Sequence, residues 1–549
     1  MMHTIISQPA SQAELKTVKR IDGYEAIKSD YPIYLTDESK LVSNDANHLF
    51  IPRDEAELVA VIQAMSALGV PITVAGSRTG LVGGSVPACG AIVSLERFDQ
   101  VESLFFDEDH QEWVLRAGAY VSLKSLEAML KSKRFPDLEK IDDSSVRSSY
   151  ERFKADVDTY LYPPDPTEMS ASLGGSVVTN ASGARTFRFG ATRNWVRGLR
   201  VVLANGEFVD IPRGKYFASE KGTFEIVNTA GEKHTLTIPD YRLPETKCTA
   251  GFFTAPGMDL IDLFIGSEGV LGIVTRVDVA LIKSEPKISI VQFLEDDYQA
   301  VRLTASLRSD QRIKLDFLEF YSGNALNLLR RVQAEAPSTV NMPPIPDEAR
   351  SALFFELNYD PQSSNDHLAV LQEIIRQHGA DPALSWAAHE PRELERFKVF
   401  RHLLPETVNS IIAERKKSIP KLHKLGTDLA VPDEHLMDIW TLYQENCDAL
   451  NLEWVAFGHI GNNHIHVNIL PRNIEELTQG LELYQLFAQK TVGWGGAVSA
   501  EHGIGKIKQN FLALMFTPEQ ISQMLHVKTV FDPDHLLNPG DLFPCEVCA

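Results

Sequence analysis

Two histidines near the C-terminus, followed by an adjacent glutamate and histidine, are the residues best suited to chemistry in this chain. His459 and His466 lie in the segment FGHIGNNHIHVN, and Glu501 and His502 lie in SAEHGIG. Two imidazoles and a carboxylate can give a divalent metal three ligands and leave a position open for a substrate. His502 would then remain beside the metal as a free base. These residues therefore predict the removal of a proton from a molecule that the metal holds.

The second half of the first segment has the pattern of a β-strand. His464, His466 and Asn468 alternate with apolar residues, so the three polar side chains share one face. A role for His464 as a fourth ligand stays open. Histidines on a strand more often make hydrogen bonds than bind metal, and no familiar motif such as HExxH is present. The spacing alone does not decide between these interpretations.

The composition is that of a globular protein with more than one domain. The chain has 549 residues, of which 44% are hydrophobic and 23% charged, and this length exceeds one compact core. A formal net charge of −21 argues against nucleic acid or an anionic membrane as the main partner, because both need a concentrated basic surface. Neither a secretory signal nor a membrane-spanning run is visible. We therefore expect a cytoplasmic enzyme.

The five cysteines are few and scattered, as is usual in a reducing compartment. Cys545 and Cys548 form one CxxC pair in the last residues. A single pair is weak evidence for zinc or an iron–sulfur cluster. We expect the tail that carries them to be frayed.

Three segments rich in small residues, 76–84, 172–183 and 266–272, precede the second half of the chain. Glycine lets backbone N–H groups approach a phosphate and form an anion-binding nest. The first segment is neither a P-loop nor a dinucleotide-binding GxGxxG fingerprint. Each segment alone could be a tight turn. Together they indicate a large, phosphate-bearing cofactor held in an extended pose.

Helix and strand patterns surround these segments. A helix is predicted to follow Asp54, which occupies its N-cap position. A hairpin is predicted over Val201–Ile211, because Asn205-Gly206 is a strong turn signal. Segments 132–160 and 212–256 look like insertions, the first of helical character, and structural decoration is their simplest interpretation.

The order of these segments resembles the FAD-binding flavoproteins of the vanillyl-alcohol oxidase and p-cresol methylhydroxylase type, in the D-2-hydroxyacid dehydrogenase branch. The resemblance runs from about Leu49 to Leu542 and is most specific in FIGSEG, at 264–269, and in SAEHGIG. It implies an α+β fold with a two-subdomain FAD-binding domain, a ferredoxin-like substrate or cap domain, and a C-terminal helical segment that returns to the FAD domain. The implied division is 1–45 for an N-terminal arm, 46–284 for the FAD-binding domain, 285–495 for the cap domain and 496–549 for the C-terminal segment.

The resemblance also implies non-covalent FAD, since 76–84 holds no histidine or cysteine to attach the flavin ring. The cofactor-binding positions that it implies are Gly76, Ser77, Arg78, Thr79 and Gly80 at the pyrophosphate, Ser170, Gly174, Gly175, Ser176 and Asn180 along the flavin, and Ile273 and Val274 near the adenine or ribitol. It makes His459, His466 and Glu501 the ligands of zinc, manganese or iron and His502 the base. Arg401 matches the family's carboxylate-binding arginine at the start of a helix. Asn468 and Lys424 are further substrate-binding candidates, although Lys424 is two residues out of register.

One departure from the family concerns the ligand segment, where His464 stands in place of an asparagine. The function that the resemblance implies is oxidation of a small D-2-hydroxy acid, D-lactate first, to the 2-oxo acid. A D-2-hydroxyglutarate or glycolate dehydrogenase stays open, as does a flavin-binding electron-transfer subunit without its own substrate. An ether-lipid synthase is disfavoured by Arg401 and the Glu501-His502 pair.

The partners of such an enzyme are less defined by the sequence. The electron acceptor is left open among a quinone, a cytochrome and an electron-transfer flavoprotein. A homodimer and peripheral contact with the inner membrane are also left open.

Overall fold

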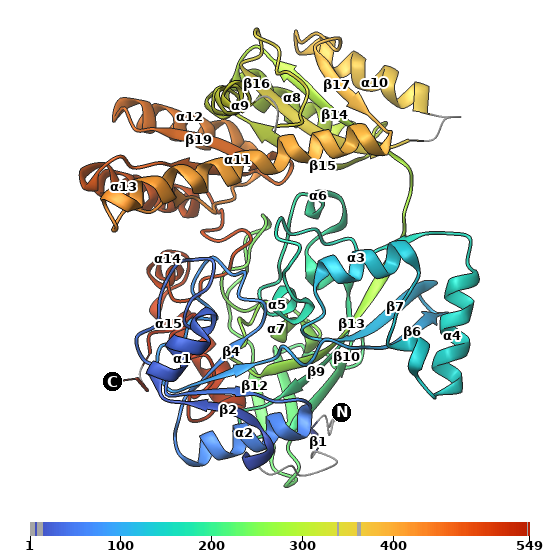
Figure 1. The fold of residues 1–549 in the computed structure, drawn as a ribbon, viewed down its shortest axis with the longest axis vertical. Coiled ribbons are helices and arrows are strands. Elements are labelled where there is room, and N and C mark those ends of the chain that lie inside the picture. The colour runs from blue at the N-terminus through green and yellow to red at the C-terminus, as the bar shows by residue number, and fades with distance from the viewer. Residues whose placement is uncertain (1–5, 8–14, 337–339, 360–363, 546, 549) are drawn as a thin grey trace.

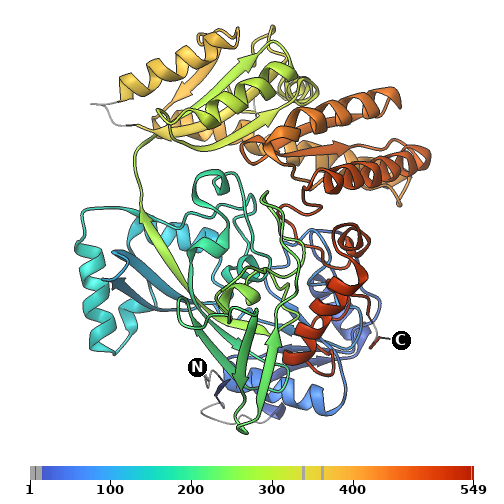
Figure 2. The ribbon, with the colours of Figure 1, turned by 180° about the vertical axis from the view of Figure 1, so that it is seen from behind.

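A computed structural model describes residues 6–7, 15–336, 340–359, 364–545 and 547–548. The chain forms two lobes (Figure 1). They are joined on one side by the passage from β13 (Ile273–Lys283) to β14 (Lys287–Leu294). On the other side, the segment after α13 (Ile474–Gly493) returns to the first lobe, as Figure 2 shows from behind. The expected α+β class, with a C-terminal return to the first lobe, is confirmed.

The first lobe is built on two main sheets. In the larger, the strand order is β1-β10-β9-β13-β7-β6, with β8 paired to β13. In the smaller, the order is β2-β3-β5-β4, and both β3 and β4 run parallel to β5. The strands are β1 (Ile6–Ser7), β2 (Lys19–Asp22), β3 (His48–Ile51), β4 (Ile72–Ala75), β5 (Ala91–Ser94), β6 (Val101–Asp107), β7 (Glu112–Gly118), β8 (Tyr160–Leu161), β9 (Val196–Val202) and β10 (Phe208–Pro212), with a separate hairpin of β11 (Thr223–Val227) and β12 (Lys233–Thr237).

Short helices surround these sheets. They are α1 (Tyr24–Asp30), α2 (Glu55–Ala67), α3 (Leu123–Ser132), α4 (Ser144–Ala155), α5 (Leu173–Val178), α6 (Thr186–Phe189), α7 (Ile261–Phe264), α14 (Gln509–Met515) and α15 (Pro518–Phe531). Because β2 pairs with β3, part of the expected N-terminal arm belongs to the smaller sheet.

The second lobe holds one large sheet with helices around it. Its strand order is β17-β14-β16-β15-β19-β20-β18, and every pairing is antiparallel. Besides β14, the strands are β15 (Leu315–Tyr321), β16 (Ser351–Asn358), β17 (Ser385–Ala388), β18 (Leu425–Gly426), β19 (Trp454–His459) and β20 (His464–Ile469). Besides α13, the helices are α8 (Asp297–Ser309), α9 (Gly323–Glu335), α10 (Ser364–Gln377), α11 (Pro391–Ser418) and α12 (Leu436–Ala449).

Local signals in the sequence explain several of these elements. The Asp54 side chain accepts a hydrogen bond from the Glu57 backbone N–H at 2.9 Å, which satisfies one of the free donors at the start of α2. Strands β9 and β10 are antiparallel around Asn205-Gly206. Gly206 has φ +82°, a conformation that a residue with a side chain rarely adopts. The predicted helix and hairpin are therefore confirmed.

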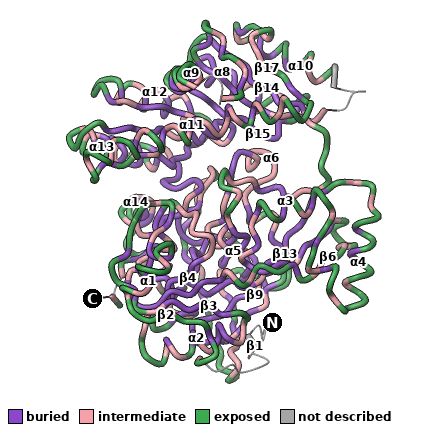
Figure 3. Tube along the Cα trace, viewed as in Figure 1, coloured by how far each residue is buried: buried purple, intermediate pink, exposed green. Residues whose placement is uncertain are grey.

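Segment 132–160 is packed onto the larger sheet. Buried positions run along the strands of both lobes, while exposed ones gather on outer helices and loops (Figure 3). From α4, Tyr150 and Phe153 are buried, and the Phe153 ring meets Trp113 of β7 edge-on at 5.1 Å between centroids. The helical character expected for this segment is confirmed, and it contributes to the core of the lobe.

Ion pairs connect the lobes through α6. Arg188 of this helix pairs with the fully buried Asp316 of β15, which also pairs with Lys287 of β14. Just before the helix, Arg185 pairs with Glu356 of β16 at 3.4 Å. Since a buried carboxylate needs a cation partner, these contacts hold the second lobe over the first.

The described part of the C-terminal tail is held by specific contacts, so the expectation that it is frayed is wrong for Cys548. Cys548 forms a disulfide with Cys89. Phe543 is buried, and its carbonyl accepts a hydrogen bond from the Gln509 side chain at 2.9 Å. Long-range contacts, which the sequence does not display, hold the tail. Within the described chain, no helix is long and apolar enough to cross a bilayer.

Asn538 ties the returning segment to the first lobe. Its side-chain oxygen accepts from the Val74 N–H at 2.8 Å, and its side-chain nitrogen donates to the Glu268 carbonyl at 3.0 Å. Its backbone N–H also donates to the Ile72 carbonyl at 2.7 Å. One buried amide therefore pairs backbone groups of two separate segments.

We predict that Asn538→Ala lowers the free energy of unfolding by about 2 kcal/mol, because it leaves two backbone groups without partners in the interior. Urea titration followed by circular dichroism measures this loss. The matched control is Asn327→Ala, at an exposed position of α9, which should leave the midpoint almost unchanged. Equal midpoints for wild type and Asn538→Ala would contradict this role.

Candidate active site

A pocket in the first lobe is bounded by all three small-residue segments and by the C-terminal segment. Ten of the predicted cofactor-binding residues line it: Gly76, Ser77, Arg78, Thr79, Gly80, Gly174, Gly175, Ser176, Ile273 and Val274. Glu501 and His502 line the same pocket. The structure thus joins segments that are more than 400 residues apart, as the numbering shows.

Two of the predicted cofactor-binding residues, Ser170 and Asn180, do not line this pocket. Ser170 is exposed. Asn180 has φ +46°, and its side-chain oxygen accepts a hydrogen bond from the Arg193 N–H at 3.0 Å. Asn180 therefore shapes the turn after α5, while a cofactor contact by either residue stays a prediction.

Close backbone packing explains the need for glycine at 174. A Cβ atom on Gly174 would lie 2.6 Å from the Cβ of Ala119 and 3.0 Å from its carbonyl oxygen. Real Cβ atoms essentially never come this close to other atoms, so a larger residue must push α5 away from the turn after β7. The glycine keeps α5 at its observed place on the pocket wall.

Unsatisfied polar atoms on this wall fit a polar ligand. The hydroxyls of Ser176 and Ser182 are buried and line the pocket. Neither has a hydrogen-bond partner among the residues that the structure describes. Buried polar groups are normally paired, so these hydroxyls suit a cofactor rich in oxygen and nitrogen.

Glu268 of the FIGSEG segment lines the pocket, although it was not among the predicted cofactor-binding residues. Its carboxylate accepts N–H hydrogen bonds from Ile504 at 2.7 Å and Gly505 at 2.6 Å. Burial and the nearby Asp541 raise the pKa of Glu268 to about 7, although the two N–H donors oppose that shift. Glu268 therefore anchors the backbone that follows Glu501 and His502.

The three predicted metal ligands meet at the Glu501 carboxylate, and Glu501 lines the pocket. Strands β19 and β20 supply His459 and His466, and the returning segment supplies Glu501. The Nε2 atoms of His459 and His466 lie 3.2 and 3.7 Å from the two Glu501 carboxylate oxygens. One ligand atom from each residue lies within 4.8 Å of the others, and the set of two imidazoles and a carboxylate fits a divalent metal.

The orientation of His466 is set by the main chain. Its Nδ1 lies 2.7 Å from the Thr427 carbonyl oxygen. A hydrogen bond there places the proton on Nδ1 and leaves the Nε2 lone pair toward Glu501, the usual arrangement of a metal-ligating histidine.

A buried lysine also reaches this cluster. The Lys247 ammonium contacts Glu501 Oε1 and lies 3.2 Å from the Gly183 carbonyl oxygen, and the lysine side chain is only 4% exposed. Burial tends to raise the pKa of Glu501, but His459 and Lys247 bring it well below its ordinary value. Segment 212–256 was expected to be structural decoration. This expectation is wrong for Lys247, which contacts a predicted metal ligand.

His464 lies behind the predicted ligands and is fully buried. Its Nε2 is 3.2 Å from Asp428 Oδ1, and its Nδ1 is 3.8 Å from Glu501 Oε1. Burial, reinforced by His466, lowers the pKa of His464 to about 3. Neither ring nitrogen has a hydrogen bond of good geometry within the described residues. A neutral imidazole with a free lone pair is what a fourth ligand needs, so that role stays a prediction.

Asp428 organises the segment that carries Glu501 and His502. Its carboxylate accepts the backbone N–H groups of both residues at 3.1 Å, and the Lys508 ammonium lies 2.6 Å from it. Burial alone would raise the pKa of Asp428, but His502, Lys508 and His464 hold it well below its ordinary value. This aspartate was not among the predicted site residues.

His502 faces the pocket with its other side toward Asp428. Its Nδ1 lies 3.3 Å from Asp428 Oδ2. Burial lowers the pKa of His502 to about 4, although Asp428 opposes that shift. The imidazole is therefore neutral at pH 7, which is the form that a base requires.

Arg401 lies well inside α11, so its expected place at a helix start is wrong. Its guanidinium pairs with both carboxylate oxygens of Glu319, at 3.0 and 3.1 Å. Glu319 Oε1 in turn lies 3.3 Å from His459 Nδ1. Burial would raise the pKa of Glu319, but Arg401 and His459 together lower it to about 2. Arg401 thus acts on His459 through an ionised carboxylate.

The two other predicted substrate residues occupy different surroundings. The Asn468 side-chain nitrogen is buried and has no hydrogen-bond partner in the described part of the chain, so a donor is free beside β18. Lys424 is partly buried, and its pKa is lowered by burial and by the neighbouring Lys40. Among the described residues, no hydrogen bond or ion pair joins Lys424 to the cluster, and its substrate role stays a prediction.

Two known family domains match this chain, one in the part that forms the first lobe and one in the part that begins at the second lobe. Residues 46–147 and 154–212 match the FAD binding domain, and residues 284–542 match the C-terminal domain of FAD linked oxidases. The chain belongs to the FAD-linked oxidases. The predicted family and the FAD-binding nature of the first lobe are confirmed.

Relatives of this FAD-linked oxidase align with it over most of their length. It is 27% identical to D-2-hydroxyglutarate dehydrogenase of Xanthomonas citri, over 90% of this chain and 88% of the relative. It is 26% identical to D-lactate dehydrogenase of Archaeoglobus fulgidus, over 95% and 98%, and 25% identical to glycolate oxidase subunit GlcD of Bacillus subtilis, over 93% and 92%. Among solved structures, an alkyldihydroxyacetonephosphate synthase has a TM-score of 0.59 at 13% identity, covering 91% of this chain and 76% of that one. This last likeness shows a shared fold.

We predict that Gly174→Ala weakens FAD binding by about tenfold or more, since overpacking of a tight contact costs about 1–3 kcal/mol. Flavin absorbance per mole of folded protein after gel filtration measures the loss. The control is Gly493→Ala, because a Cβ there meets no atom within 4 Å. Full flavin content in Gly174→Ala would show that α5 can shift without disturbing the cofactor.

Proposed function

We propose that this FAD-linked oxidase oxidises a D-2-hydroxy acid to the 2-oxo acid, with D-lactate as the first candidate. The observation that carries the proposal is that Glu501 and His502 line the cofactor pocket and also belong to the histidine–carboxylate cluster. The proposed base and one proposed metal ligand therefore line the cavity in which the flavin would bind, and the two histidine ligands lie 3.2 and 3.7 Å from that carboxylate. The names of the three relatives support the same class of substrate.

The cofactor would be held mainly by the backbone of 76–80 and by the wall formed by 174–176. FAD, when bound, supplies an acceptor for the hydride that leaves the hydroxyl-bearing carbon. The remaining requirements fall on the protein, which must remove the hydroxyl proton, hold the carboxylate and keep the carbon facing the flavin.

His502 is the proposed base. It is neutral at pH 7, so it can accept the hydroxyl proton on the nitrogen that faces the pocket. The positive charge that this creates lies beside the ionised Asp428, 3.3 Å from Nδ1. Asp428 thus fixes the ring orientation and stabilises the protonated imidazole, the division of labour found in Asp–His pairs.

His459, His466 and Glu501 would hold a divalent metal, which polarises a hydroxyl oxygen and makes its proton easier to remove. Zinc, manganese and iron all suit two imidazoles and a carboxylate. In the structure described here, Lys247 contacts the same Glu501 oxygen that faces His459. We infer that the ammonium and the metal compete for this carboxylate.

Arg401 and Asn468 are the proposed contacts for the substrate carboxylate and its neighbours. Because Glu319 occupies the guanidinium of Arg401 on one side, Arg401 can meet a substrate only with its remaining N–H groups. Asn468 offers a buried donor without a partner among the described residues. An electron-transfer subunit without its own substrate is disfavoured, since such a subunit has no use for His502 and its paired Asp428.

Anaerobic titration with D-lactate, L-lactate, glycolate and D-2-hydroxyglutarate tests the proposal. A D-acid should bleach the flavin absorbance of the wild type. His502→Ala should keep its flavin but slow bleaching by about 100-fold or more, the usual scale for a general base. The control is His234→Ala, at an exposed position of β12. Bleaching of His502→Ala at the wild-type rate would rule out the base, and a flavin that none of the acids bleaches would rule out the substrate class.

We predict that Lys247→Met tightens binding of zinc or manganese by about tenfold, equal to ~1.4 kcal/mol, because the metal no longer displaces an ammonium from Glu501. Calorimetric titration of chelator-treated protein measures the affinity. Glu501→Gln should abolish binding in either background, which ties the effect to this carboxylate. Weaker metal binding in Lys247→Met would contradict competition and place the lysine among the groups that support the metal.

A further inference from the structure

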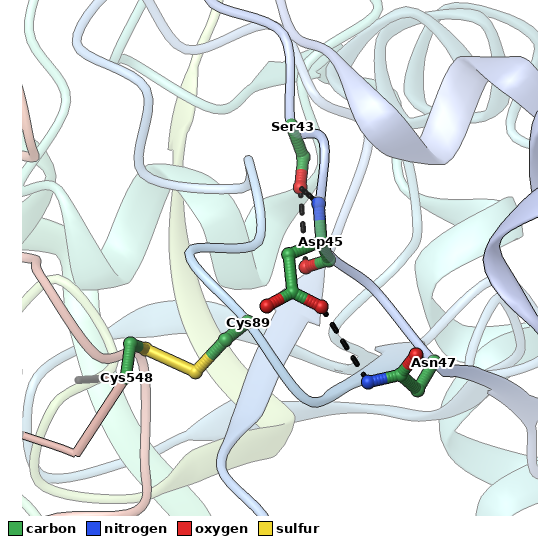
Figure 4. Close-up of a disulfide and its surroundings, with 5 residues drawn as sticks. All are labelled: Ser43, Asp45, Asn47, Cys89 and Cys548. Atoms are coloured by element: carbon green, nitrogen blue, oxygen red, sulfur yellow. Dashed lines mark hydrogen bonds between the residues drawn. A yellow bond between two sulfur atoms is a disulfide. The ribbon is translucent and has the colours of Figure 1, made fainter.

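Three of the five cysteines meet where the C-terminal tail crosses the first lobe. Cys89 and Cys548 are joined by a disulfide that links positions 459 residues apart. Cys545 carries a free thiol, and its sulfur lies within 4.8 Å of the other two. Figure 4 shows the disulfide beside the loop that contains Ser43, Asp45 and Asn47.

The two sides of this disulfide belong to segments that border the cofactor pocket. Cys89 follows Gly84 and Ser85, which line the pocket, and Gly90 beside it accepts a backbone hydrogen bond from Asn47 at 2.7 Å. Cys548 ends the segment that begins at Asn538, another lining residue. The disulfide therefore connects the loop after the small-residue segment 76–84 to the tail that begins at Asn538, and both border the same pocket.

The third cysteine gives this bond a reaction partner. Thiol–disulfide exchange requires a thiolate that can reach one sulfur of the disulfide. Cys545 and Cys548 are both partly exposed, whereas Cys89 is buried. The sulfur of Cys548 is thus the more accessible target, and the CxxC spacing allows the two tail cysteines to bond to each other.

We propose that Cys89, Cys545 and Cys548 form a thiol–disulfide exchange site that fastens the tail to the first lobe or releases it. The Cys545 thiol loses its proton, and its sulfur bonds to the sulfur of Cys548. The Cys89–Cys548 bond breaks, and the Cys89 sulfur takes up a proton, so the exchange involves no net oxidation. Full opening to three thiols takes two electrons and two protons from an external dithiol, which becomes a disulfide.

The consequence of exchange is a change in how the tail is held. With Cys89–Cys548 formed, a covalent bond adds to the hydrogen bonds of Asn538 and Gln509. With Cys545–Cys548 formed, only noncovalent contacts hold the tail, among them those hydrogen bonds, the buried Phe543 and the Lys506–Asp541 ion pair. In a reducing compartment a disulfide of this kind is transient and responds to the redox state, so the site suits control of the tail more than permanent bracing.

Mapping of the disulfides tests the chemistry. The purified protein is equilibrated in glutathione redox buffers, the thiols are alkylated, and the linked peptides are identified by mass spectrometry. The wild type should give both Cys89–Cys548 and Cys545–Cys548. Cys545→Ser should give the first bond alone, and Cys89→Ser the second alone. Absence of both bonds from the wild type in oxidising buffer would overturn the proposal.

A metal bound by three thiolates is the competing outcome. Elemental analysis of the purified wild type decides it, with the same measurement on Cys545→Ser and Cys548→Ser. Zinc at one equivalent that disappears in both variants would overturn the exchange site. Metal content that is unchanged by the two substitutions would support it.

The effect on the tail is measured with the matched pair Cys545→Ser and Cys548→Ser, each of which removes one thiol of the CxxC. Dithiothreitol should lower the melting temperature and speed flavin release in the wild type and in Cys545→Ser. It should do neither in Cys548→Ser, which cannot form the bond to Cys89. An equal response in both variants would overturn the assignment. Because the readouts are melting and flavin release, they do not depend on the proposed substrate.

Discussion

The burial of Asp428 is the constraint on which the rest of the site depends. A carboxylate removed from water is costly unless hydrogen bonds and cations surround it. This one is fully buried and receives the N–H groups of Glu501 and His502, the Ser499 hydroxyl and the Lys508 ammonium. The segment that returns from the second lobe can satisfy Asp428 only by folding tightly around it. That fold places Glu501 toward the histidines and His502 toward the pocket.

A second buried carboxylate plays a similar part on the other side of the cluster. Glu319 is held ionised by the two-point contact with Arg401, and it faces His459. On this side a charged contact between α11 and β15 orients His459 of β19, and on the other side Asp428 holds the returning segment. The contacts around Glu319 lie within the second lobe, whereas Asp428 joins that lobe to the segment that returns to the first. The geometry of the cluster therefore depends both on packing within the second lobe and on the path of the returning segment.

The sequence predicts those structural features that are set by residues close together in the chain. Asp54 caps its helix and Asn205-Gly206 turns its hairpin because both signals act within a few residues. The three small-residue segments were recognisable as one cofactor site because a phosphate-bearing ligand needs glycine wherever the backbone must come close. The alternation of histidine and asparagine in 464–468 likewise predicts the strand that the structure shows.

What the sequence does not display is the pairing of distant charges and thiols. Lys247 comes from a stretch without a helix or strand pattern, so nothing in its neighbours indicates that it meets Glu501 254 residues later. Asp428 and Glu319 look like ordinary acidic residues until the fold buries them. The same holds for Cys89 and Cys548, whose contact depends on the path of the tail.

Charge balance connects these findings to the proposed substrate. Counting only carboxylates, lysines and the arginine, the described cluster has three negative groups (Glu319, Asp428 and Glu501) and three positive ones (Arg401, Lys247 and Lys508). It is therefore neutral in this count without a metal. A divalent ion would add two positive charges, and a 2-hydroxy acid with an ionised carboxylate adds one negative charge. Transfer of its hydroxyl proton to His502 leaves this total unchanged. An excess positive charge in a buried site is costly, so the substrate carboxylate would offset part of the metal's charge and favour its binding. Lys247 contacts Glu501. Moving its ammonium away from this carboxylate would therefore lower the positive charge beside a bound metal.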